Sequence, residues 1–151
     1  MSEGIKIVAT NRKAKFEYFL FEKLEAGISL HGSEIKSIRA GQISLAEAHV
    51  QINEREAWLM DVHIAPYEQS GKFFNHEPRR PRKLLLHSNE IRKLWEGVRQ
   101  KGVTIVPTRM YLKEGRAKVE IAVAKGKKLY DKRDAIAKRD AERDQRRGLE
   151  Y

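Results

Sequence analysis

The chain has 151 residues, of which 31 are lysine or arginine and 21 are aspartate or glutamate, so its formal net charge is +10. It contains no cysteine, which excludes a disulfide framework and a thiolate metal site. No segment approaches the ~20 apolar residues of a membrane span, and residues 1–9 lack the apolar core of a signal peptide. We therefore expect a cytoplasmic protein with no membrane partner, and the basic charge favours a polyanionic partner such as nucleic acid.

The positive charge is concentrated in two segments. Residues 72–101 hold nine lysines and arginines against three glutamates, and residues 125–151 hold ten basic residues against six acidic ones. Residues 78–83, here called the cationic strip, read Pro-Arg-Arg-Pro-Arg-Lys. Their prolines restrict the chain, so that less entropy is lost when the arginines meet phosphates. An acidic protein surface would explain the strip equally well.

Hydrophobic spacing and turn residues predict the elements of the first half of the chain. They are a flexible N-terminus over 1–9, strands over 16–24 and 28–30, a helix from Ser33 to Gly41, and strands over 48–52 and 58–64 that end at Pro66. Phe19 and Phe21, with Trp58 and Trp95 further on, fit core periodicity and are assigned to packing.

The second half begins with a polar loop over residues 67–81, whose length is typical of functional or disordered loops. The apolar segment 83–87 leads into a helix from Ser88 to Gly102. Alternation over 103–124, with a turn at Glu114 and Gly115, predicts a β-hairpin.

These elements predict a mainly β fold with helices (β+α) and no βαβ alternation. The best match is a small antiparallel β-barrel of the oligonucleotide-binding (OB) type with about six strands and flanking helices, and an SH3-like barrel is the alternative. Residues 10–128 are expected to form this RNA-binding domain. Residues 129–151 are expected to form a basic C-terminal tail that is disordered when free, because it is poor in large apolar residues.

A search for catalytic or metal-binding residues finds no convincing group. The five histidines are isolated along the chain, and the Gly126-Lys127-Lys128 segment lacks the other residues of a phosphate-binding loop. We therefore predict no catalytic residue, no metal, no cofactor and no enzymatic activity. Nucleic-acid binding has better support, since a basic cluster at Asn11, Arg12 and Lys13 lies beside aromatic residues that can stack on unpaired bases.

Six blocks of sequence together resemble the family of SsrA-binding proteins (SmpB), the bacterial partners of transfer-messenger RNA. The blocks are NRKA at 11–14, EAGI at 25–28, GSEIKSIRAG at 32–41, HIAPY at 63–67, RRPRKLLL at 79–86 and AKGKKLYDKR at 124–133. No single block is decisive, but their order over nearly the whole chain is. The resemblance implies an OB-type barrel with flanking helices and a protein that is not an enzyme.

The resemblance also implies a function. Family members bind the tRNA-like domain of transfer-messenger RNA and deliver the charged RNA to stalled ribosomes for rescue and tagging of the nascent chain. The family's RNA-contacting surface corresponds here to Asn11, Glu25, Leu85 and Lys118, with Arg12 and Lys13 as basic neighbours. Glu25 would accept hydrogen bonds from base or sugar donors and so contribute specificity.

By the same resemblance, the tail enters the empty messenger channel of the small ribosomal subunit near the decoding centre and folds into a helix there. Gly126 would let the chain turn at the root of the tail. The residues assigned to this role are Gly126, Lys127, Lys128, Tyr130, Asp131, Lys132, Arg133, Lys138 and Arg139. Pairs of an acidic residue followed four positions later by a basic one would stabilise this helix. The alternative is that the tail only increases solubility and has no docking site.

The partners implied are transfer-messenger RNA, the stalled ribosome and, through the charged RNA, elongation factor Tu. We expect a monomer. The alternative function is that of a general ribosomal or single-stranded-RNA-binding OB-fold module. Such a module would show no preference for a tRNA-like fold.

Overall fold

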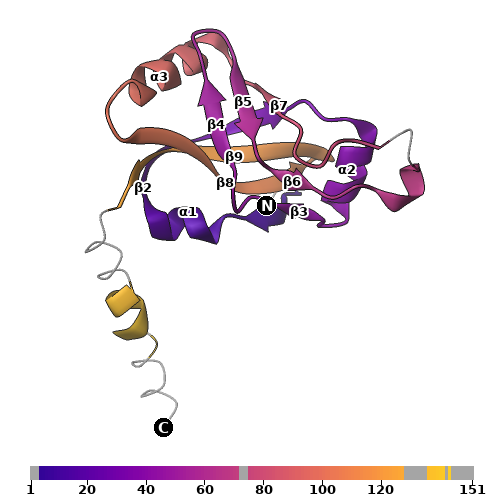
Figure 1. Cartoon of the computed structure of the whole chain (residues 1–151), viewed down its shortest axis with the longest axis horizontal. Helices are drawn as coiled ribbons and strands as arrows, with labels where there is room; N and C mark the ends of the chain where they lie inside the picture. Colours follow the sequence, from indigo (N-terminus) through magenta and orange to yellow (C-terminus); the bar gives the residue numbers. More distant parts are fainter. Residues whose placement is uncertain (1–3, 72–74, 128–135, 142, 144–151) are drawn as a thin grey trace.

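The structure is a computed structural model that describes residues 4–71, 75–127, 136–141 and 143 (Figure 1). The helices of the body are α1 (Arg12–Glu17), α2 (Gly32–Arg39) and α3 (Ser88–Val98), with the 3-10 turn η1 (Glu68–Ser70). The strands are β1 (Lys6–Thr10), β2 (Tyr18–Ile28), β3 (Ile43–Ser44), β4 (His49–Ile52), β5 (Ala57–Met60), β6 (His63–Ile64), β7 (Arg82–Leu85), β8 (Val103–Lys113) and β9 (Arg116–Gly126).

Seven strands form one antiparallel sheet in the order β1-β8-β4-β5-β7-β2-β9. Because β8 also pairs with β9, the six strands after β1 close into a ring, and β1 pairs with residues 109–112 of β8, on the same edge of β8 as β4. The short strands β3 and β6 form a separate pair. The prediction of a mainly β fold with helices and an OB-like arrangement is therefore confirmed, with the closure taking the form of this six-strand ring.

The core lies inside the ring and is built by alternation along the strands. Leu59, Ile105 and Ile121 are fully buried, and they come from β5, β8 and β9. Burial of each such side chain stabilises the fold by roughly 1.5–3 kcal/mol. The long β8–β9 hairpin was predicted, and its turn is made by Glu114 and Gly115, both with positive φ angles (51° and 78°).

The N-terminal part differs from the sequence prediction. Residues 6–9 of the segment expected to be flexible lie in β1, because their backbone pairs with residues 110–112 of β8. Helix α1 occupies residues 12–17, where no helix was predicted. Consequently one strand, β2, begins at Tyr18 and runs unbroken to Ile28 in place of the two predicted strands.

The assignment of Phe19 and Phe21 to the core is wrong, since their exposed fractions are 43% and 59%. In this part of β2 it is Leu20 that packs inward, against the small cluster of Ala14, Val106 and Ala124. The pairing of β2 with β9 shifts between Leu20 and Lys23, which changes the side-chain alternation from that point on. The two phenylalanines therefore lie on the outer face of the ring.

Two arginines of the cationic strip, the buried Arg82 and the half-buried Arg80, bind a carboxylate of the body. Arg82 is fully buried, and its Nε donates to Glu34 Oε2 at 2.6 Å, while its Nη1 donates to the carbonyl of Val62 at 2.7 Å. Arg80 donates to the other oxygen of Glu34. Since Glu34 is itself fully buried, this ion network ties α2 to the segment that leads into β7.

The described part of the tail is helical over residues 136–141 and at 143 (Figure 1). Arg143 forms an ion pair with Asp140 at 2.8 Å, one turn earlier. The guanidinium of Arg139 lies 5.9 Å from the centroid of the Phe16 ring of α1. Among the described residues, no helix is both long and apolar enough to cross a membrane.

Candidate nucleic-acid interface

A row of residues crosses neighbouring strands near the start of α3. Leu85 of β7 pairs with Gly27 of β2, Gly27 pairs with Lys118 of β9, and Lys118 pairs with Tyr111 of β8. Residues paired in this way share one face of a sheet. The register therefore brings two of the predicted site residues, Leu85 and Lys118, to either side of a glycine.

Leu85, Gly27 and Lys118 line a groove of about 580 Å³ beside α3. Leu85 is 56% exposed, so a large apolar side chain is presented to solvent in a groove that also contains Glu25 and Lys118. A Cβ added to Gly27 would lie 3.2 Å from Leu85 Cβ, a tight contact. Gly27 therefore keeps the floor of the groove open. The groove is lined further by Arg55, Lys83 and His87.

Glu25 is held in position by two neighbours. The hydroxyl of Tyr111 donates to Glu25 Oε1, and Lys113 Nζ lies 3.7 Å from the same oxygen. The hydrogen bond from Tyr111, assisted by the nearby lysines, lowers the pKa of Glu25, while burial and the same hydrogen bond raise the pKa of Tyr111. Glu25 is therefore an oriented carboxylate that can accept hydrogen bonds from a ligand.

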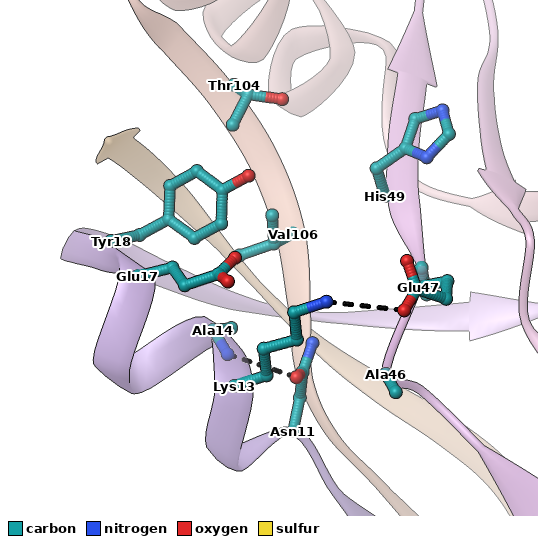
Figure 2. Close-up of a pocket in the computed structure, with 11 residues that line it drawn as sticks. Asn11, Lys13, Ala14, Glu17, Tyr18, Ala46, Glu47, His49, Thr104 and Val106 are labelled. Carbon is teal, nitrogen blue, oxygen red and sulfur yellow. Dashed lines mark hydrogen bonds and ion pairs between the residues drawn. The ribbon is translucent and has the colours of Figure 1, made fainter. Parts of the chain in front are cut away.

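The other predicted residues, Asn11, Arg12 and Lys13, lie at a different place. Asn11 and Lys13 line a hollow of about 280 Å³ between α1 and the segment before β4. Figure 2 shows both side chains, with Lys13 reaching toward Glu47. Lys13 Nζ is 3.2 Å from Glu47 Oε1, and this hydrogen bond raises the pKa of Lys13. This hollow and the groove beside α3 have no lining residue in common, so the six predicted RNA-binding residues form two groups.

Asn11 has a structural role that the sequence prediction did not include. It is only 4% exposed, its Oδ1 accepts from the Ala14 backbone N–H at 3.1 Å, and its Nδ2 donates to the Pro107 carbonyl at 2.9 Å. Asn11 therefore caps α1 and fixes it to β8. Its side chain positions Arg12 and Lys13 rather than presenting its own amide at the surface.

The residues assigned to the tail are described only in part. Gly126 ends β9 opposite Tyr18, so its backbone is still paired in the sheet, and the segment 128–135 after the root of the tail lies outside the described residues. Lys127 donates its backbone N–H to Glu17 at 2.8 Å, which ties the root of the tail to the end of α1. Lys138 and Arg139 lie in the helical segment 136–141. Lys128, Tyr130, Asp131, Lys132 and Arg133 lie outside the described residues.

Sequence reasoning missed Gly27, Tyr111 and Lys113 as parts of the site. Gly27 lies in the sequence block EAGI, but its pairing with Leu85 cannot be predicted from the spacing of residues along the chain. Tyr111 is 86 residues from Glu25, so nothing local marked their contact. The turn at Glu114 and Gly115 did fix the β8–β9 register, and that register places Tyr111 opposite Lys118.

Histidine and carboxylate side chains form no metal-binding cluster within the described residues. His76, which is 8% exposed, has its Nε2 2.8 Å from the carbonyl of Ile64 and its Nδ1 2.8 Å from the hydroxyl of Ser33. Since the carbonyl only accepts, Nε2 donates and Nδ1 accepts. This histidine therefore fastens the loop before β7 to α2.

A basic chain built on a closed ring of strands, with exposed apolar, acidic and cationic side chains along one groove, has the features of the OB-like class of nucleic-acid-binding proteins. The family model described as SmpB protein matches residues 8–151. The chain belongs to the SmpB family.

Individual relatives agree with this assignment. An SsrA-binding protein of Roseiflexus sp. (strain RS-1) is 62% identical over 144 residues, which cover 95% of this chain and 91% of that protein. An SsrA-binding protein of Trichodesmium erythraeum (strain IMS101) is 54% identical over 147 residues, covering 97% and 94%. A solved structure described as "tmRNA-SmpB: a journey to the center of the bacterial ribosome" contains a chain with a TM-score of 0.67 and 45% identity, covering 80% of this chain and 84% of that one.

Proposed function

We propose that this chain binds the tRNA-like domain of transfer-messenger RNA and delivers the charged RNA to stalled ribosomes in trans-translation. The observation that carries the proposal is the groove beside α3, which exposed Leu85 lines together with Glu25 and Lys118 in a chain of the SmpB family. Relatives of this chain carry the name SsrA-binding protein, and the description of a similar solved structure names tmRNA-SmpB and the bacterial ribosome.

Each groove residue has a distinct chemical role in this proposal. Leu85 packs against a sugar or an unpaired base, Lys118 neutralises a phosphate, and the oriented Glu25 accepts hydrogen bonds from base or 2′-hydroxyl donors. Because phosphate contacts carry no sequence information, specificity rests on Glu25 and Leu85. Arg12 and Lys13, positioned by Asn11, supply a second cationic contact at a separate place on the body.

The C-terminal tail has a different role. It occupies the vacant messenger channel near the decoding centre, with its root at Gly126 and Lys127 and its basic residues, among them Lys138 and Arg139, against ribosomal RNA. An intact message would exclude the tail from the channel. Rescue is therefore restricted to ribosomes whose messenger channel is empty. The chain acts as a cytoplasmic monomer without enzymatic activity or cofactor, and it meets elongation factor Tu only through the charged RNA.

The first experiment measures the affinity for the tRNA-like domain and for unstructured RNA of equal length at several salt concentrations. A clear preference for the tRNA-like fold that persists as salt rises supports the proposal, because purely phosphate-driven binding weakens steeply with salt. Equal affinity for both RNAs contradicts it and favours a general ribosomal or single-stranded-RNA-binding module.

A second experiment separates the two ends of the chain. Deleting residues 131–151 leaves β9 and Lys127 in place, so the affinity for the tRNA-like domain stays within a few fold while tagging on stalled ribosomes is lost. Loss of RNA binding on this deletion would show that the tail has been given the wrong role.

A further inference from the structure

The two phenylalanines that were expected in the core mark a second hollow on the body. Phe21, 59% exposed, lines a hollow of about 490 Å³ between β2, the C-terminal half of α3 and the ends of β8 and β9. It has no lining residue in common with the groove of Glu25, Leu85 and Lys118, or with the hollow beside α1. Phe21 shares this hollow with aliphatic side chains, and exposed apolar surface that is rimmed by polar residues marks interaction sites.

The chemistry of this hollow combines an apolar lining with a cationic rim. Leu94 of α3, with Val103 and Val123 of β8 and β9, supplies aliphatic surface, and Gly97 leaves the helix wall without a side chain. Three lysines surround it, namely Lys93 of α3, Lys101 of the turn between α3 and β8, and Lys125 of β9. The hollow contains one acidic residue, Glu22, whose Oε1 is 3.1 Å from Lys93 Nζ.

The cationic and aromatic character continues along β2 toward the root of the tail. Phe19, 43% exposed, pairs in register with Lys125, and Lys127 Nζ lies 5.3 Å from the centroid of the Phe19 ring. Aromatic side chains alternating with cations along a groove form the surfaces on which single-stranded nucleic acids stack. Aromatic faces take the bases, and the lysines take the phosphates between them.

We propose that the hollow lined by Phe21, Lys93, Lys101 and Lys125 is a second RNA site, which takes an unpaired nucleotide. The base stacks on Phe21 over the aliphatic lining, and its flanking phosphates meet the three lysines. An acidic peptide would satisfy the lysines but would leave the ring without a planar partner. The site is distinct from the groove of the proposed function and does not depend on it.

The test uses the full chain and a short fluorescein-labelled oligoadenylate, followed by anisotropy. Phe21→Ala is expected to weaken binding about 5- to 100-fold, the range found for loss of one base–aromatic stack. Phe21→Tyr retains the ring and restores the affinity. Ile7→Ala removes a comparably exposed apolar side chain (52%) from β1 and serves as the matched control with unchanged affinity. Lys125→Ala is expected to reduce the salt slope by about 1.

Location and class of ligand are tested separately. Irradiation of the chain with an oligonucleotide containing 5-iodouridine is expected to crosslink Phe21. Polyglutamate is expected to compete poorly. Unchanged affinity of Phe21→Ala, a crosslink confined to the groove of Glu25 and Leu85, or polyglutamate competing as well as RNA would each overturn the proposal. Leu85→Asp is expected to keep its affinity for oligoadenylate while losing affinity for the tRNA-like domain. The two binding measurements therefore test the two sites independently.

Discussion

Replacing Glu34 by glutamine is expected to reduce the free energy of unfolding by about 3–5 kcal/mol, the range for breaking a buried ion pair. Glu34 and Arg82 are fully buried, and Arg80 shares the same carboxylate. In the variant, two guanidinium groups remain close together without a carboxylate between them. Because domains of this size are stable by only about 5–15 kcal/mol, the loss is a large part of the total.

The matched control is the exposed ion pair of Glu22 and Lys93, whose side chains are 61% and 70% exposed. Glu22→Gln makes the same chemical change at the surface, where such pairs contribute about 0–1 kcal/mol. Urea unfolding followed by circular dichroism gives both values, and the melting temperature of Glu34→Gln is expected to fall by roughly 10–15 °C. Equal stability losses in the two variants would refute a supporting role for the buried network.

The same network sets a pH dependence. Burial on its own raises the pKa of Glu34, but hydrogen bonds from Arg80, from the His31 backbone N–H and from Arg82 outweigh burial and lower it. A lowered pKa means that the stabilisation is complete above the ordinary glutamate pKa of about 4.3 and is lost as the pH falls through the folded-state value. The stability difference between the wild-type chain and Glu34→Gln should thus be constant at neutral pH and shrink in acid. A difference that grows in acid would contradict this sign.

Three further changes test the site. Asn11→Ala removes the cap of α1 and is expected to lower stability by about 1 kcal/mol in urea unfolding, an effect that an asparagine with no capping role would not produce. Tyr111→Phe removes the donor to Glu25, so the pKa of Glu25 should rise toward its ordinary value in a carboxyl NMR titration; an unchanged pKa would argue against the contact. Gly27→Val fills the floor of the groove, and binding to the tRNA-like domain should weaken while β2 still forms; wild-type affinity would place the RNA elsewhere.

Sequence patterning predicted the β8–β9 hairpin and α3 because both follow local rules. The hairpin has alternating apolar residues and a turn that a glycine permits, and α3 has the predicted helical spacing of apolar residues. Its cap is His87 rather than the expected Ser88, and it ends at Val98, before the expected Gly102. Helix α1 was missed although its cap, Asn11, was in view, since six residues give no clear helical period. Within the predicted loop over 67–81, the described residues 67–71 and 75–81 contain no strand, and their only helical segment is the 3-10 turn η1.

Burial was the part that patterning could not supply. The sequence suggested that Arg80 and Arg82 are available to bind RNA. Their partner, Glu34, is more than 40 residues away in sequence, and only the fold brings the three residues together. Phe19 and Phe21 read as core because aromatic residues usually are, but the shifted pairing of β2 and the packing of Leu20 put them outside. The resemblance to a family supplied Glu25, Leu85 and Lys118, and the strand register explains why two of them share one face.

The most direct test of the central claim compares Leu85→Asp with Ile7→Asp for binding to the tRNA-like domain of transfer-messenger RNA. Both residues are aliphatic, lie on strands and are about equally exposed (56% and 52%), so both variants add the same charge at little risk to folding. Burying a leucine against a ligand is worth about 1.5–3 kcal/mol, so Leu85→Asp should raise the Kd at least about 10-fold while Ile7→Asp changes it little. Equal affinities of the two variants would contradict the assignment of the groove beside α3 as the RNA-binding surface.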